Sequence, residues 1–114
     1  MQILLIILYR EDLLDEVLTA LVEMEITGAA VLDGTSMERV LSEDVPIFAG
    51  LWDTLGSGGG QTRTIVAPIQ DRSLFEPLIR LLREVGADFA NPDIGKAFTI
   101  PVDQYVEPID GENP

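Results

Sequence analysis

Residues 2–9 constrain the fold most strongly, because every side chain from Ile3 to Leu8 is apolar. A continuously apolar run of this length is typical of a strand that is buried on both faces in the middle of a sheet. The run is too short to cross a bilayer and has no basic segment before it. We therefore expect the rest of the chain to supply neighbouring strands and a covering layer.

An amphipathic helix is predicted directly after this strand, over residues 11–24. Its apolar side chains recur at helical spacing, at Leu13, Leu14, Val17, Leu18, Leu21 and Val22. Asp12 is the predicted N-cap, and the early acidic residues favour the helix dipole. Gly28 ends the pattern.

A second helix is predicted to begin near Ser73, because Ser73 and Glu76 match a capping box. Pro77 is tolerated only close to a helix start, which agrees with this position. Gly86 is the predicted C-cap. The predicted buried face consists of Leu78, Ile79, Leu82 and Val85.

Three further strands are predicted, at residues 29–33, 62–69 and 96–102. Pro101 favours an edge position or a strand end for the last of them. Strand-helix-strand therefore occurs twice, which predicts an α+β fold, the ferredoxin-like βαββαβ two-layer sandwich, with a long loop between the second and third strands. At 114 residues the chain suits one domain. We expect this domain over residues 1–106, with the loop at 34–61, and a polar tail over 107–114.

The composition excludes several classes of function. Seven basic residues against 20 acidic ones give a formal charge of −13, which opposes binding to nucleic acid or to an anionic membrane surface. Cysteine and histidine are both absent from the sequence, so disulfides, the usual zinc sites and Ser-His-Asp or Cys-His catalysis are excluded. A metal would have to be a hard cation held by carboxylates. We expect a cytoplasmic protein without direct membrane insertion.

The connection over residues 34–61 is much longer than a hairpin needs, and loops of this length are usually functional or disordered. Its middle carries apolar residues at helical spacing, at Ile47, Phe48, Leu51, Trp52 and Leu55. This loop stripe is expected to pack on the chain's own sheet or on a neighbouring subunit, since exposed patches this apolar are uncommon on soluble monomers. The alternative is a docking patch for a partner protein, centred on Phe48 and Trp52.

The segments ITGAAV (residues 26–31) and GKAFTIPV (residues 95–102), together with the long loop, resemble the nitrogen-regulatory PII signal-transduction family. The matched positions are Ile26, Thr27, Gly28, Val31, Gly95, Lys96, Phe98 and Val102. The resemblance implies a homotrimer whose inter-subunit clefts take a nucleotide, while the long loop contacts a regulated protein. It also implies that Lys96, the only lysine of the chain, reaches an anionic ligand.

The resemblance assigns ligand-site roles to Thr27, Gly28, Arg39, Gly95 and Lys96, and each glycine also has a structural explanation. Gly28 suits a turn that needs a positive φ or close packing, and Gly95 could simply open a strand. Lys96 could protect an exposed strand edge from pairing with another chain. We expect Lys96 to face a cleft between subunits.

This sequence departs from the family where the phosphates of a nucleotide would lie. A Gly-x-Gly-Arg segment of the family aligns with residues 36–39, which keep Arg39 but neither glycine. One glycine before the lysine is replaced by Asp93, and two C-terminal arginines fall on Glu107 and Ile109.

Glu38, Asp93 and Glu107 therefore place negative charge at the predicted phosphate positions. A carboxylate about 4 Å from a phosphate costs roughly 1 kcal/mol in water and up to about 4 kcal/mol at an effective dielectric near 20. Ordinary ATP binding is not expected. Arg39 and Lys96 could still hold a smaller anion, such as a carboxylate or bicarbonate.

Two alternatives from other classes stay open at this point. The first is a trimeric protein like the CutA family, which shares the fold and would bind a divalent cation through carboxylates; the missing histidine and cysteine oppose a soft metal. The second is an enzyme that uses Glu38 and Asp93 as acid and base. The sequence identifies no catalytic residue, no metal ligand and no cofactor, and we expect a regulatory protein that is not an enzyme.

Overall fold

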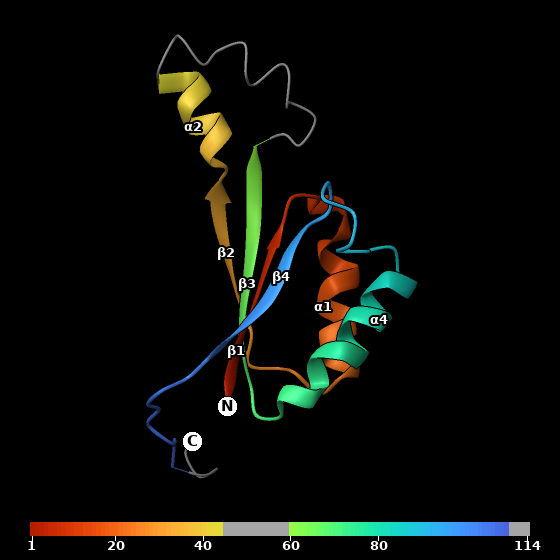
Figure 1. Cartoon of the computed structure of the whole chain (residues 1–114), viewed down its shortest axis with the longest axis vertical. Helices are drawn as coiled ribbons and strands as arrows, with labels where there is room; N and C mark the ends of the chain where they lie inside the picture. Colours follow the sequence, from red (N-terminus) through yellow and green to blue (C-terminus); the bar gives the residue numbers. More distant parts are fainter. Residues whose placement is uncertain (45–59, 110–114) are drawn as a thin grey trace.

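The computed structural model of the chain describes residues 1–44 and 60–109. Four strands form one antiparallel sheet in the order β2-β3-β1-β4 (Figure 1). The strands are β1 (Gln2–Leu8), β2 (Ala30–Thr35), β3 (Gln61–Ile69) and β4 (Gly95–Pro101). β1 lies in the middle of the sheet, as its apolar sequence predicts, and β4 is an edge strand that ends at Pro101. The arrangement is a small α+β fold and is compatible with the ferredoxin-like fold.

Two helices cover one face of this sheet (Figure 1). They are α1 (Leu14–Glu23) and α4 (Phe75–Glu84), and a short 3-10 turn leads into each, η1 (Glu11–Leu13) and η4 (Arg72–Leu74). The core lies between the helices and the sheet and includes Leu4, Ile6, Leu8, Val17, Leu21, Ile65, Leu78 and Leu82, all at most 1% exposed. Burial of these side chains is the main stabilising term of the fold.

The prediction that β1 is buried on both faces is wrong for one face. Leu4, Ile6 and Leu8 point toward the helices and are fully buried, whereas the alternating Ile3, Leu5 and Ile7 are only half-buried. The reason is that the described residues place a helical layer on one side of the sheet only. Val22 and Val85, which were predicted on buried helix faces, are also exposed.

Both predicted helix N-caps are wrong. Asp12 lies inside η1, where its carboxylate accepts two hydrogen bonds from the Arg10 guanidinium at 2.9 and 2.7 Å. In η4 the cap is Asp71, whose carboxylate accepts from the backbone N–H of Ser73 at 2.9 Å. This hydrogen bond lowers the pKa of Asp71, because it stabilises the charged form. With the 3-10 turns included, the helical segments begin at Glu11, as predicted, and at Arg72, one residue before the predicted start.

Both helices end in the same kind of loop, with a different residue in the left-handed position. Gly86 (φ 101°) follows α4, as predicted, whereas Glu25 (φ 63°) takes this position after α1. In each loop the next residue donates its N–H to a helix carbonyl at 2.8 Å: Ala87 to Leu82, and Ile26 to Leu21. These are Schellman motifs, in which glycine is the usual left-handed residue.

We expect Glu25→Gly to stabilise the protein by about 1 kcal/mol, because glycine adopts a positive φ without a steric penalty and the change removes a negative charge from a helix C-terminus. The matched change, Gly86→Ala, should lower stability by a similar amount. Urea denaturation of the two variants and the parent chain measures both effects. A loss of stability in Glu25→Gly would contradict this account of the α1 terminus.

The β2–β3 hairpin extends beyond the rest of the sheet. The pairs Gly34–Thr62 and Thr35–Gln61 lie beyond Arg63, which is the last β3 residue paired with β1. The predicted strand ended at residue 33, so the connection between the strands covers residues 36–60 and not 34–61. The hairpin carries helix α2 (Met37–Asp44), which lies away from α1 and α4 (Figure 1).

Helix α2 was not predicted. Its N-cap is Ser36, whose hydroxyl accepts the backbone N–H of Arg39 at 3.2 Å. The N-cap serine ahead of an acidic first turn was the signal that could have revealed it. The predicted loop stripe of Ile47, Phe48, Leu51, Trp52 and Leu55 lies outside the described residues.

Candidate functional site

Lys96 lies on the edge strand β4, directly opposite Ile7 of β1. Residues opposite each other in an antiparallel pair point to the same side, so Lys96 shares the sheet face of Ile3, Leu5 and Ile7, which is turned away from the helices. Its side chain is exposed. Within the described part of the chain Lys96 forms no ion pair, so its ammonium group is open to an anion or to another chain.

Gly95 has a structural role that explains the residue without a ligand. Its φ is 146°, and it stands opposite Leu8 in the β1–β4 pair. A Cβ at this position would overlap the carbonyl oxygen of Ile7 and lie 3.1 Å from the Cα of Leu8. The fold itself therefore requires glycine here.

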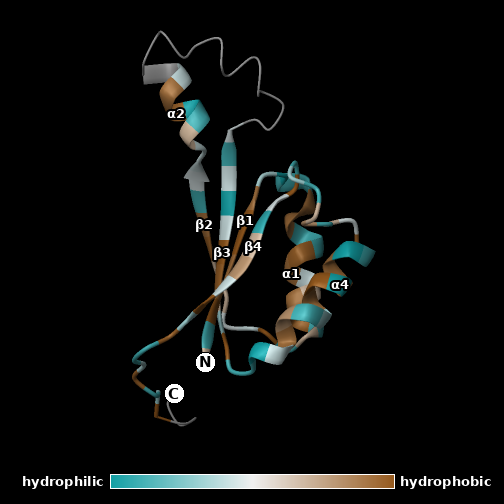
Figure 2. Cartoon of the chain, viewed as in Figure 1, coloured by the Kyte–Doolittle hydropathy of each residue, from teal (hydrophilic) through white to brown (hydrophobic). Residues whose placement is uncertain are grey.

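The sheet face that carries Lys96 is largely apolar, and we refer to it as the open face. By the register, its members are Ile3, Leu5 and Ile7 of β1, Ala30 and Leu32 of β2, Thr64, Val66 and Pro68 of β3, and Lys96, Phe98 and Ile100 of β4. Leu32, Phe98 and Ile100 are exposed. Figure 2 shows hydrophobic residues along β1 and along the half of β3 farther from α2, while the hairpin end is hydrophilic.

Thr27 and Gly28 line a pocket of about 340 Å³ at the end of the sheet away from α2. The other lining residues are Met24, Glu25, Ile26, Pro68, Ile69, Gln70 and Leu74. Gly28 has no positive φ, and a Cβ added there would meet nothing within 4 Å. Both structural explanations predicted for Gly28 are therefore wrong within the single chain.

The single chain does not bring the predicted site residues together. Thr27 and Gly28 lie next to the end of β3 near Ile69, whereas Lys96 lies at the Leu8 end of β1 and on the opposite edge of the sheet. Three strand spacings, about 14 Å, separate the edge strands β2 and β4. Arg39 is on α2, beyond the end of β2, so it also lies apart from Lys96.

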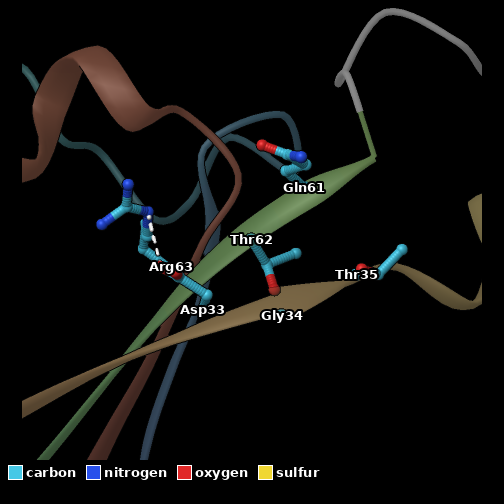
Figure 3. A pocket seen from close by; sticks show the side chains of 6 residues that line it. All are labelled: Asp33, Gly34, Thr35, Gln61, Thr62 and Arg63. Atoms are coloured by element: carbon cyan, nitrogen blue, oxygen red, sulfur yellow. Dashed lines mark ion pairs between the residues drawn. The ribbon is translucent and has the colours of Figure 1, made fainter.

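A second pocket, of about 220 Å³, lies where β2 and β3 extend as a hairpin (Figure 3). Six residues line it: Asp33, Gly34, Thr35, Gln61, Thr62 and Arg63. The Arg63 guanidinium forms ion pairs with Asp33 at 3.1 Å and with Glu11 at 2.7 Å. Two carboxylates thus balance its charge, and the pocket offers no excess positive charge to an anion. This cluster was not predicted, because it joins three separate segments.

The carboxylates that replace family residues lie on three different elements. Glu38 is on α2, Asp93 is in the loop before β4, and Glu107 follows β4. The described residues contain no group of three or more carboxylates that could hold a metal ion.

Comparison with the models of known protein families finds no match to this chain, and a search of the curated proteins finds none either.

Proposed function

We propose that this chain is a PII-like regulatory protein with a ferredoxin-like fold, and that it acts as a cytoplasmic homotrimer which binds a small anion between its subunits. The observation that carries the proposal is the open face. A sheet with one covered face and one apolar, uncovered face needs a second layer, and the described part of the chain supplies only one.

A second copy of the chain is the partner that fits the open face best. The face offers apolar side chains on all four strands and only one charge, that of Lys96. Copies that each carry a formal charge of −13 repel one another, so their association has to rest on apolar contact. Three copies, rather than two, follow from the resemblance to the PII family.

Assembly would also explain why the predicted ligand residues lie apart. Thr27 and Gly28 sit at one corner of the sheet and Lys96 at the opposite corner, so a site that uses both must combine residues of two copies. The open space beside Gly28 leaves room for a neighbouring chain or a ligand. Lys96 lies at the margin of the open face, where a cleft between packed copies would form.

The ligand we propose is a small anion, such as a carboxylate or bicarbonate, and not ATP. Glu38, Asp93 and Glu107 would each repel a polyphosphate if they line the cleft as the family resemblance implies. The Arg63 pocket is a weaker candidate for an anion, because Asp33 and Glu11 already neutralise its cation.

A regulated protein is the proposed partner of the region around α2. Met37 and Val40 are exposed on this helix, at the tip of the hairpin and away from the core (Figure 1). The loop stripe of Phe48 and Trp52, which lies outside the described residues, is expected to contribute to the same contact.

Neither alternative gains a specific observation. The described residues show no carboxylate cluster for the divalent cation of a CutA-like protein. Glu38 lies on α2 and Asp93 in the loop before β4, and the described residues add no observation that favours an acid–base pair between them. In the described part of the chain, no helix has the length and hydrophobicity to span a bilayer.

The thermal midpoint tests the proposed ligand. Binding to the folded state stabilises it by RT ln(1 + [L]/Kd), about 2.7 kcal/mol at a hundredfold excess over Kd, or roughly 10 °C for a domain of this size. We expect a concentration-dependent rise with a carboxylate or bicarbonate that is lost in Lys96→Ala. Arg80→Ala is the matched control, because it removes one exposed positive charge from the helical layer, and it should keep the rise.

Three outcomes would overturn parts of the proposal. A rise with ADP or ATP that disappears in Lys96→Ala would show that the acidic replacements do not exclude nucleotides. A rise with calcium or magnesium alone would favour the divalent-cation alternative. A parent chain that responds to no anion would leave Lys96 without the proposed role.

A further inference from the structure

The segment that follows β4 leaves the body of the protein as an arm, residues 103–109. The last backbone hydrogen bond before the arm joins the N–H of Val102 to the carbonyl oxygen of Met1 at 3.2 Å. Every residue from 103 to 109 is exposed. Figure 1 shows the arm projecting to the side of the sheet opposite α1 and α4.

The arm carries more apolar surface than a solvated tail would. Tyr105 is 49% exposed, Val106 89% and Ile109 88%. These are three large apolar side chains within seven residues; Val106 and Ile109 are almost fully exposed in the described part of the chain, and Tyr105 is about half exposed. Single exposed apolar residues are ordinary, but a cluster on a projecting segment indicates a contact surface.

We propose that the arm packs against a second copy of this chain, which makes it an arm exchanged between subunits. The inference rests on the proposed self-association through the open face. The arm follows the edge strand β4 and projects on the same side of the sheet as the open face, away from α1 and α4 (Figure 1). A copy that covers the open face would occupy that side, and the apolar side chains of the arm would meet it.

The negative charges of the arm indicate that its contact with another copy has to be apolar. The arm adds Asp103 and Glu107 to a protein that is already strongly acidic, so electrostatics oppose its docking on another copy. The attraction must come from Tyr105, Val106 and Ile109. Association is therefore expected to tighten when salt screens the repulsion between copies.

Two measurements on the full-length chain test the arm. Sedimentation equilibrium compares the dissociation constant of the assembly for the parent chain, Val106→Ser and Gln104→Ser. Val106→Ser should weaken the assembly at least about tenfold, since burying one such side chain contributes more than a tenfold step in affinity. Gln104→Ser changes a neighbouring exposed polar residue on the same arm and should leave the constant within about twofold.

The second measurement follows the mobility of the arm directly. The chain has no cysteine, so Gln104→Cys gives a single attachment site for a nitroxide label. We expect the label to be immobilised as the protein concentration rises through the assembly transition, and to stay mobile when Val106→Ser is added at concentrations where that variant is dissociated.

The outcomes separate this inference from the proposal on which it rests. An assembly that forms equally well in Val106→Ser, with a mobile label, would overturn the exchanged arm and leave self-association standing. A chain that stays monomeric at all concentrations would overturn both. A monomer with an immobilised label would show that the arm folds back on its own chain, and would overturn the exchange.

Discussion

Gly95→Ala should lower the free energy of unfolding by about 3 kcal/mol or more. A methyl group there would overlap the Ile7 carbonyl oxygen, and the φ of 146° is one that alanine rarely adopts. The obstacle is the backbone of the central strand, which cannot move without breaking its pairing with β3 and β4. Globular proteins have a total stability of about 5–15 kcal/mol, so the loss would be a large fraction of the whole.

Gly28→Ala is the control for this prediction. A Cβ at Gly28 meets no atom within 4 Å and the φ is not positive, so the isolated fold should be unchanged or slightly stabilised by the lower entropy of the unfolded chain. Urea denaturation at low protein concentration measures both variants. Equal stability of Gly95→Ala and the parent chain would contradict the observed register of β4 on β1.

Phe98→Asp should abolish self-association over the concentration range of the parent assembly. Phe98 is 39% exposed on the open face, opposite Leu5 of β1, so a charge is tolerated by the single chain. Within a packed interface it would leave an unpaired carboxylate out of water and remove an aromatic contact. We expect the dissociation constant to rise by a factor on the order of 100 or more, which corresponds to about 3 kcal/mol or more.

Val22→Asp is the matched control, because it adds the same charge at an exposed apolar residue on α1, on the outer side of the helical layer. It should change the dissociation constant only slightly. Sedimentation equilibrium measures both variants, and thermal unfolding checks that each is folded. If Val22→Asp and Phe98→Asp weakened the assembly equally, the contact would not be the open face.

Local patterns in the sequence were enough to identify most of the fold. The apolar run of β1, the helical spacing around Val17 and Leu78, and Gly86 at a helix end each report on residues close together in the chain, and the structure agrees with them. Caps were predicted less well, because several polar residues near a helix start compete for the same backbone N–H groups. Asp71 holds this position in η4, whereas Ser73 matched the sequence pattern better.

The candidate site was predicted only as separate residues. No local pattern shows that Arg63 pairs with Glu11 and Asp33, because these residues come from three segments. The reason for Gly95 is also remote, since the atom that excludes a side chain belongs to Ile7. For Gly28 the local explanations failed, and only the tertiary structure shows the open space beside it.

The sequence by itself determined the four strands, the two covering helices, their order along the chain and the strongly acidic composition, because hydrophobic periodicity and charge are properties of each segment alone; it did not reveal helix α2. Only the tertiary structure decided which face of the sheet the helices cover, and therefore that Ile3, Leu5 and Ile7 lie beside Lys96 on an uncovered face. The physical reason is that alternation along a strand defines two faces equally well. The side on which the helices pack, set by the connections between the strands, makes one face the core and leaves the other open.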